Sequence, residues 1–327
     1  MTSPNASLPV SPGISVILPV LNEQAHLESS IRAILSQNYM GKFEVILALG
    51  PSRDSTNEIA RSLAAEDARV ILVENPLGRT AAGLNIALSA STQDVVVRVD
   101  AHAEIPNDYL QLVVEILRES SAVNVGGVMG AEGITFFESA VAAAMCSPFG
   151  VGGSRFHTGG KAGFVDTVYL GAFIRQAVVD AGGFDERFIR AQDWELNYRL
   201  RENGGKIYFD PRLHVTYRPR PNLIKLAKQY FQYGTWRRVV SRSHSGTINL
   251  RYLAPPFALV GTLISVISGL LIHPIFYLPA AVYGGFVLLS SLLIAKSVSE
   301  YFSLLAIIPT MHFAWGAGFI TSTKTLR

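Results

Sequence analysis

The sequence ISVILPVLNE, residues 14–23, begins the pattern that decides the fold. Its first part is apolar and β-branched and ends at Pro19, which is typical of a short buried strand. Three similar runs follow, separated by segments whose apolar residues have helical spacing. Strands are predicted at 14–19, 43–49, 69–73 and 95–99, and helices at 23–35, 57–65 and 81–90. This alternation predicts an α/β domain whose mostly parallel sheet carries helices on both faces.

Polar or turn-forming residues follow three of the predicted strands. Asn22 and Glu23 follow the first strand, residues 50–54 follow the second, and Asp100 and His102 follow the fourth. Because ligands of such sheets bind at the carboxyl ends of the strands, we expect these residues to converge on one rim. The sequence contains neither a dinucleotide-binding GxGxxG after the first strand nor a P-loop motif. A carboxylate acting through a divalent cation is the usual alternative for holding a phosphate.

The chain changes character along its length. Of its 327 residues, 49% are hydrophobic and 16% are charged, whereas soluble domains carry roughly 25% charged residues. Residues 1–210 hold 16 Lys and Arg against 24 Asp and Glu, but residues 211–251 hold nine basic residues and no acidic one. Since this basic neck adjoins apolar segments, membrane lipids with anionic headgroups are the expected partner. No nucleic-acid binding is expected.

Three uncharged stretches are long enough to cross a bilayer, which takes about 20 apolar residues. They lie at 252–272, 275–295 and 302–320. The basic neck predicts a multi-pass cell-membrane protein whose globular part is cytoplasmic. Three spans would place Lys324 and Arg327 on the opposite side, against the same rule, so a re-entrant or interfacial segment is an alternative.

The predicted organisation has four parts. They are a flexible N-terminus at 1–12, a globular domain at 13–218, a juxtamembrane neck at 219–251 and a membrane domain at 252–327. The N-terminus lacks the basic and apolar regions of a signal peptide. The basic, aromatic segment 222–240 is expected either to lie flat on the membrane or to pack on the globular domain. The single cysteine, Cys146, is expected to be a packed apolar residue.

Five short motifs occur in order along the globular part. They are ILPVLNE at 17–23, DST at 54–56, GRTAAGLN at 78–85, DAH at 100–102 and QDWE at 192–195. Together they resemble family 2 glycosyltransferases with a GT-A fold over about residues 13–218. The DAH form and the apolar C-terminal segments are most similar to the membrane-bound exopolysaccharide, or succinoglycan-type, glucosyltransferase branch. The resemblance implies an inverting hexosyltransferase that uses a UDP- or other nucleotide-diphosphate sugar.

Several residues acquire expected roles in that enzyme. Asp100 and His102 are expected to hold Mn²⁺ or Mg²⁺ with the donor's diphosphate, although the family more often has a second acid at the position of His102. The resemblance implies that Pro19, Glu23 and Asp54 line the nucleobase and ribose pocket. Alternatively, Asp54 caps a helix. Arg79 is a further candidate as a diphosphate ligand, or else a surface ion-pair partner. His214 is expected to be a packed or exposed histidine, and the alternative is a third metal ligand.

Asp193 is the expected catalytic base. It lies at the predicted start of a helix, where an acceptor hydroxyl could approach, and the alternative is a plain helix cap. Trp194 and Glu195 are acceptor candidates beside it. Glu195 is expected either to orient an arginine or acceptor groups or to lie on a solvated helix face. The glycine-rich stretch 150–160 is expected to be either a lid, with Arg155 and His157 reaching inward, or a simple connector.

The expected acceptor is a lipid-linked or polysaccharide-precursor molecule, which receives one sugar per encounter at the cytoplasmic membrane face. Residues 232–237 differ in order from the Gln-x-x-Arg-Trp motif of processive members of the family. One alternative is sugar transfer directly to polyprenyl phosphate, which would need little help from a base. Less favoured alternatives are a nucleotidyltransferase and a membrane scaffold without catalytic activity.

Overall fold

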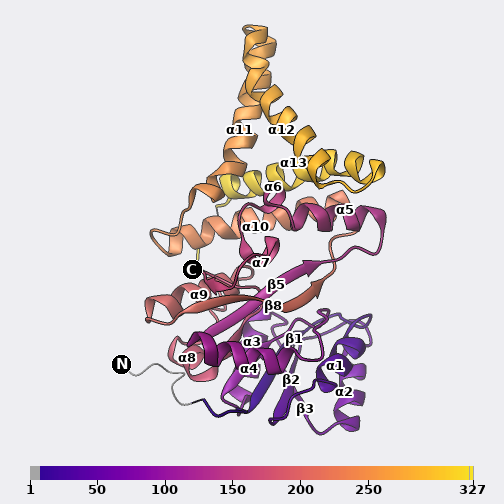
Figure 1. The fold of residues 1–327 in the computed structure, drawn as a ribbon, viewed down its shortest axis with the longest axis vertical. Helices are drawn as coiled ribbons and strands as arrows, with labels where there is room; N and C mark the ends of the chain where they lie inside the picture. The colour runs from indigo at the N-terminus through magenta and orange to yellow at the C-terminus, as the bar shows by residue number, and fades with distance from the viewer. Residues whose placement is uncertain (1–7, 324, 327) are drawn as a thin grey trace. The chain divides into compact units, whose positions relative to one another are not determined.

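The computed structural model describes residues 8–323, 325 and 326, and the chain forms two compact units (Figure 1). The first unit comprises Met1–Gly130 and Gly159–Tyr217, and the second comprises Ala131–Thr158 and Arg218–Arg327. Most of the N-terminal segment predicted to be flexible lies outside the described residues.

The first unit is built on an eight-stranded sheet with the order β3-β2-β1-β4-β7-β5-β8-β6. β1, β2, β3 and β4 are parallel to one another, and β7 pairs antiparallel with β4 and with β5. The strands are β1 (Ile14–Val20), β2 (Phe43–Leu49), β3 (Val70–Glu74), β4 (Val95–Arg98), β5 (Asn124–Ala131), β6 (Gly163–Phe164), β7 (Ala172–Ile174) and β8 (Ile207–Tyr217). The predicted α/β fold with a mostly parallel sheet is confirmed.

Helices cover both faces of this sheet. They are α1 (Leu27–Leu35), α2 (Thr56–Glu66), α3 (Thr80–Ala90), α4 (Tyr109–Ser120), α8 (Arg175–Asp180) and α9 (Gln192–Glu202). Alternate residues of a strand point to opposite faces, so Val16 and Leu18 of β1 join one core with α1, α2 and α4. On the other face α3 packs closely, because a Cβ at Gly83 would stand 3.3 Å from the Cβ of Pro19. Continuous apolar strands are therefore required, as in other parallel sheets buried on both sides.

The strand order reverses between β1 and β4. The pairing of these two strands ends at Ile17 with Arg98, whereas β1 continues beside β2 to Val20. Pro19 therefore lies beyond the last β1–β4 pair, where its missing N–H leaves that ladder intact. Beyond this point the two strands separate, and such reversal points are where open α/β sheets bind ligands.

The second unit is helical. Its elements are α5 (Phe136–Met145), α6 (Pro148–Val151), α7 (Arg155–Thr158), α10 (Leu223–Ser243), α11 (Leu250–Leu271), the 3₁₀ helix η1 (Pro274–Tyr277), α12 (Leu278–Ile294) and α13 (Val298–Thr321). A capping box between Thr135 and Glu138 begins α5. The prediction that Cys146 is packed is wrong, because it lies exposed where α5 ends.

The three apolar segments predicted from the sequence form helices that are long and apolar enough to cross a membrane. They correspond to α11, to η1 with α12, and to α13. The break at His273 and Pro274 separates the first two helices, where the His273 ring accepts a hydrogen bond from the backbone of Ile275. Figure 1 shows α11 and α12 side by side as a helical hairpin.

Candidate active site

Hydrogen bonds join the loops that follow β1 and β2. Asn22, which has a left-handed backbone (φ 56°), accepts from the backbone N–H of Arg53 at 2.8 Å, and the Asn22 N–H donates to the hydroxyl of Ser52 at 3.1 Å. Asparagine tolerates this conformation better than most residues. The carboxyl ends of the two strands therefore form one connected rim, as the sequence predicts.

A buried guanidinium joins two acids that are 93 residues apart in the sequence. Arg98, the last residue of β4, donates from Nη2 to Asp100 Oδ1 at 3.0 Å and from Nη1 to Asp193 Oδ1. The side chain of Arg98 is 7% exposed, while those of Asp100 and Asp193 are 22% and 24% exposed. Both carboxylates thus remain partly accessible while they share one cation. Asp100 and Asp193, the expected metal ligand and the expected base, therefore both contact one guanidinium group.

The two acids differ in electrostatic character. Burial raises the pKa of Asp193 to about 6, with the charge of Arg98 acting against the shift and the charge of Asp100 adding to it. Burial also acts to raise the pKa of Asp100, but Arg98 and His102 together bring that pKa below its ordinary value. The pKa of Arg98 itself is raised by the two acids despite burial. Asp193 is therefore the better proton acceptor and Asp100 the more persistent anion.

His102 and Glu23 connect the loops after β4 and β1 across the point where these strands separate. The Nδ1 atom of His102 lies 2.9 Å from Oε1 of Glu23. A carboxylate can only accept hydrogen bonds, so Nδ1 carries the proton and Nε2 is the nitrogen with the lone pair in the neutral ring. This arrangement is typical of metal-binding histidines, whose second nitrogen donates to a carboxylate. Glu23, predicted as a pocket residue, therefore contacts a predicted metal ligand.

The donor set suits a cation held mainly by a diphosphate. Among the described residues, no group of three or more His, Cys, Asp and Glu side chains could hold a metal by itself. Asp100 and His102 would supply two ligands, and Mg²⁺ commonly takes one or two protein ligands with substrate phosphates and water. His214, the third candidate, packs against β5: a Cβ at Gly130 would lie 2.1 Å from the His214 ring.

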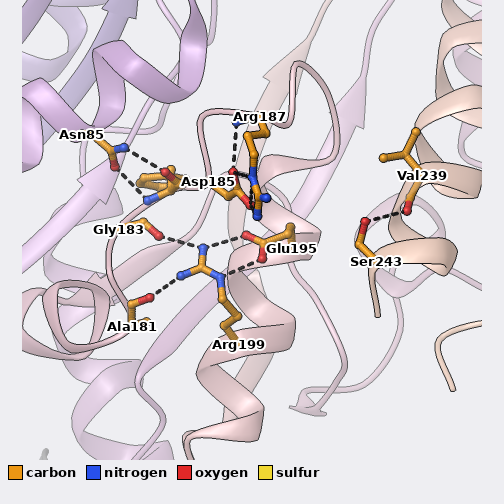
Figure 2. A network of polar contacts seen from close by, with 10 residues as sticks. Asn85, Ala181, Gly183, Asp185, Arg187, Glu195, Arg199, Val239 and Ser243 are labelled. Atoms are coloured by element: carbon orange, nitrogen blue, oxygen red, sulfur yellow. Dashed lines mark hydrogen bonds and ion pairs between the residues drawn. The ribbon is translucent and has the colours of Figure 1, made fainter. Parts of the chain in front are cut away.

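A second polar network supports the helix that carries Asp193 (Figure 2). Asp193 lies in the first turn of α9, after Ala191, which has a positive φ of 64° and occupies the N-cap position. Glu195 is 1% exposed and binds Arg199 through both carboxylate oxygens, at 2.7 and 2.6 Å. Arg199 in turn donates to the carbonyl groups of Ala181 and Gly183. Glu195 thus orients an arginine that ties α9 to the turn after α8.

Asn85 of α3 braces the same turn. Its Nδ2 donates to the Phe184 carbonyl oxygen, and its Oδ1 accepts from the Phe184 N–H, both at 2.8 Å. A further bond joins Asn85 Nδ2 to Glu186 Oε1 at 3.0 Å. Asn85 therefore reproduces the hydrogen bonding of a neighbouring strand and fixes the chain that leads to α9.

The remaining predicted site residues lie as follows. Both oxygens of Asp54 contact the start of α2 or the loop after β1: Oδ1 accepts from Thr56 and Oδ2 accepts from the backbone of Gln24 at 3.4 Å. The Thr56 hydroxyl lowers the pKa of Asp54. Arg79 is exposed at the start of α3. Trp194 is largely buried, and its ring stacks on Tyr198.

Arg155 and His157 belong to the second unit, in the short helix α7. His157 packs against Phe156 with ring centroids 4.4 Å apart, and burial lowers the pKa of His157 to about 4. At neutral pH this ring is uncharged. Their predicted part in a lid remains a prediction.

Arg98 is the site residue that the sequence reasoning missed. It lies in the run VVVRV at 95–99, where apolar residues indicate only a buried strand. A lone arginine in such a run is itself a signal, because buried arginine is rare unless it is paired. Two acids at the predicted strand end and helix start would have been its natural partners.

Comparison with known proteins defines the class. The family model described as "Glycosyl transferase family 2" matches residues 15–176. The chain is 33% identical over 311 residues to the succinoglycan biosynthesis protein ExoA of Rhizobium meliloti (strain 1021). The aligned residues make up 93% of each protein. The chain belongs to glycosyl transferase family 2, and it is a glycosyltransferase.

Two further comparisons concern a second relative and a solved structure. The chain is 25% identical over 268 residues to a dolichyl N-acetyl-alpha-D-glucosaminyl phosphate 3-beta-D-2,3-diacetamido-2,3-dideoxy-beta-D-glucuronosyltransferase of Methanococcus voltae, which covers 79% of this chain and 83% of the relative. Its fold is similar to that of the mannosyltransferase PcManGT from Pyrobaculum calidifontis in complex with GDP-Man and Mn²⁺. That similarity has a TM-score of 0.68 and 20% identity, over 98% of this chain and 89% of the other. The predicted GT-A fold is confirmed.

Proposed function

We propose that this glycosyltransferase moves one sugar, with inversion, from a nucleotide-diphosphate sugar to a lipid-linked or polysaccharide-precursor acceptor at the cytoplasmic face of the membrane. The observation that carries the proposal is that the two terminal nitrogens of Arg98, at the carboxyl end of β4, donate to Asp193 and Asp100. The GDP-Man complex of the similar fold and the name of the succinoglycan relative support the donor class and the acceptor class.

Asp193 has the properties that a general base needs. With a pKa of about 6 it is mostly ionised at neutral pH, yet it is a stronger base than an ordinary aspartate. It takes the proton of the acceptor hydroxyl as that oxygen forms its bond to the sugar C1 atom. The bond from C1 to the phosphate oxygen breaks at the same time, and its electron pair leaves with the nucleoside diphosphate.

Asp100 and His102 would hold the divalent cation beside the donor. When bound, the cation neutralises the negative charge that grows on the departing diphosphate. Glu23 keeps His102 in the tautomer that presents Nε2 as the ligand atom. Arg98 restrains the base and keeps the two acids from repelling each other.

The test is a screen of radiolabelled nucleotide sugars with membranes that contain the enzyme, with and without EDTA. Wild type is compared with Asp100→Ala and Asp193→Ala. Asp67→Ala is the matched control, because Asp67 also pairs with an arginine, Arg69, but precedes β3 at the opposite edge of the sheet.

We expect transfer to be lost on chelation and in both site variants, and to persist in the control. Restoration by Mn²⁺ or Mg²⁺ would identify the cation. Transfer that survives Asp193→Ala would contradict the role of the base and favour direct transfer to polyprenyl phosphate.

A further inference from the structure

The helix α13 differs from the other two apolar helices in how much of it is enclosed. In its most apolar stretch 39% of the residues are buried within the protein, against 17% for α11 and 17% for η1 with α12. A helix that faces lipid on most sides has few buried positions, as α11 and α12 do. The helices that pack against α13 therefore indicate its depth in the membrane.

The closest partner of α13 is α10, and their backbones touch. A Cβ at Gly234 of α10 would stand 2.0 Å from the carbonyl oxygen of Trp315 in α13. A Cβ at Gly318 of α13 would stand 2.0 Å from the carbonyl oxygen of Phe231 in α10. Small residues allow helices to approach in this way. The Thr235 hydroxyl donates to Gly318 O at 3.3 Å, and the Ser322 hydroxyl donates to Thr235 O at 3.2 Å. The C-terminal part of α13 is thus fixed to the middle of α10.

α10 cannot lie in the hydrocarbon core. It carries five basic residues and no acidic one: Lys225, Lys228, Arg237, Arg238 and Arg242. Each charged side chain at the centre of a bilayer costs at least about 2.5–3.5 kcal/mol. The guanidinium of Arg238 lies 5.2 Å from the ring centroid of Phe319 in α13, a cation–π contact. The end of α13 therefore lies at the level of charged groups.

The middle of α13 contacts polar backbone rather than lipid alone. Nε2 of His312 lies 2.9 Å from the carbonyl oxygen of Phe149 in α6. A Cβ at Gly150 would lie 3.1 Å from the terminal methyl of Met311. α13 also packs along α5, which begins at a capping box with Glu138. Figure 1 shows α13 running beside α10 and α5, across the base of the α11–α12 hairpin.

We infer that α13 does not cross the membrane but lies in the headgroup region beside α10, and that only the α11–α12 hairpin enters the hydrocarbon core. The partner of this α10–α13 surface is an anionic lipid surface, because Lys225 and Lys228 are exposed on α10 beside Ile224, which is 82% exposed. Both ends of α13 then lie on the side of α10. This arrangement removes the conflict with the positive-inside rule that three spans would create.

The inference rests on the proposed membrane location. Site-directed labelling can test the position of α13 separately from that location. Single cysteines are placed in the full-length chain after Cys146→Ser, since Cys146 is exposed. Ser245→Cys reports the loop after α10, Ile272→Cys the hairpin tip, and Ser299→Cys and Thr325→Cys the two ends of α13. A membrane-impermeant maleimide is applied to intact bacteria that express each variant, before and after permeabilisation.

We expect Ser245→Cys, Ser299→Cys and Thr325→Cys to react only after permeabilisation, while Ile272→Cys reacts in intact cells. Reaction of Thr325→Cys but not Ser299→Cys in intact cells would overturn the inference. If Ser245→Cys, Ser299→Cys and Thr325→Cys reacted in intact cells and Ile272→Cys did not, the inference on α13 would stand. The proposed cytoplasmic orientation would then be wrong. Recovery of the protein in the soluble fraction would refute the membrane location and the inference with it. Size-exclusion chromatography in detergent identifies any variant that fails to fold, and Thr323→Cys replaces Thr325→Cys in that case.

Discussion

The role of Arg98 leads to a quantitative prediction for Arg98→Gln. The substitution removes the buried cation that two partly exposed acids share. An opposite charge within about 4–6 Å lowers the pKa of an acid by about 1–3 units. Without it, the pKa of Asp193 should rise from about 6 by about 1–3 units. The ionised fraction of the base at pH 7 would fall from about nine-tenths to between about one-half and one-hundredth.

The assay is the pH dependence of kcat/KM for wild type, Arg98→Gln and Arg98→Lys. In wild type, the base is ionised above its pKa, so kcat/KM should rise with pH through about pH 6 and then level off. In Arg98→Gln the rise should move to higher pH, so that activity lost at neutral pH returns in alkaline buffer. Arg98→Lys keeps a charge but not the fork that reaches both acids, so it should fall between the two.

The control is Arg187→Gln, which removes an arginine that is 58% exposed and pairs with Asp185. Its pH profile should match that of wild type. If Arg98→Gln lowers kcat/KM equally at every pH, Arg98 does not tune the base and the reasoning fails. Thermal unfolding of each variant is measured alongside, because removal of one partner from a buried ion pair costs about 3–5 kcal/mol of unfolding free energy.

Three further predictions concern stability and packing. Asp193→Asn should abolish transfer yet raise the free energy of unfolding at pH 7 by up to about 3 kcal/mol, because the folded protein favours the protonated form of this acid. The melting temperatures of wild type and Asp193→Asn should converge as pH falls from about 6 to about 4. A difference that stays constant with pH would contradict the raised pKa of Asp193. Glu195→Gln should lower the free energy of unfolding by about 3 kcal/mol, because it leaves the charge of Arg199 without its carboxylate partner. An unchanged midpoint of urea unfolding would show that the ion pair does not support α9. Gly318→Leu should lower the melting temperature in detergent, because even the Cβ of the new side chain would overlap the Phe231 backbone. The control variant Gly261→Leu should leave the melting temperature unchanged, since a Cβ there meets nothing within 4 Å. Equal effects of the two substitutions would argue against the α10–α13 contact.

The sequence was sufficient to predict the sheet and the polar rim at the carboxyl ends of its strands. Runs such as 14–20 and 43–49 are strongly apolar because their strands are buried on both faces. The carboxyl ends of parallel strands share one edge, so the positions of Asp100 and the loop after β1 followed from topology alone. The start of α9 near Asp193 followed from helical spacing.

The details that depend on three-dimensional pairing could not be predicted in the same way. The Glu23–His102 contact requires β1 to lie next to β4, which alternation of strands and helices does not specify. The burial of Glu195 follows from its ion pair with Arg199 and is not visible in an otherwise polar helix. For α13, an apolar composition suits a spanning helix and an interfacial helix equally well, and only its contacts distinguish them.

The brace formed by Asn85, Glu195 and Arg199 bears on attempts to redesign the acceptor specificity of this enzyme. Asn85 and Arg199 hold residues 181, 183 and 184 through their backbone groups. Directed-evolution libraries can therefore vary an exposed position such as Ile189 while the three bracing residues stay fixed. Asp193, the proposed proton acceptor, should then keep its place as new acceptor molecules are selected.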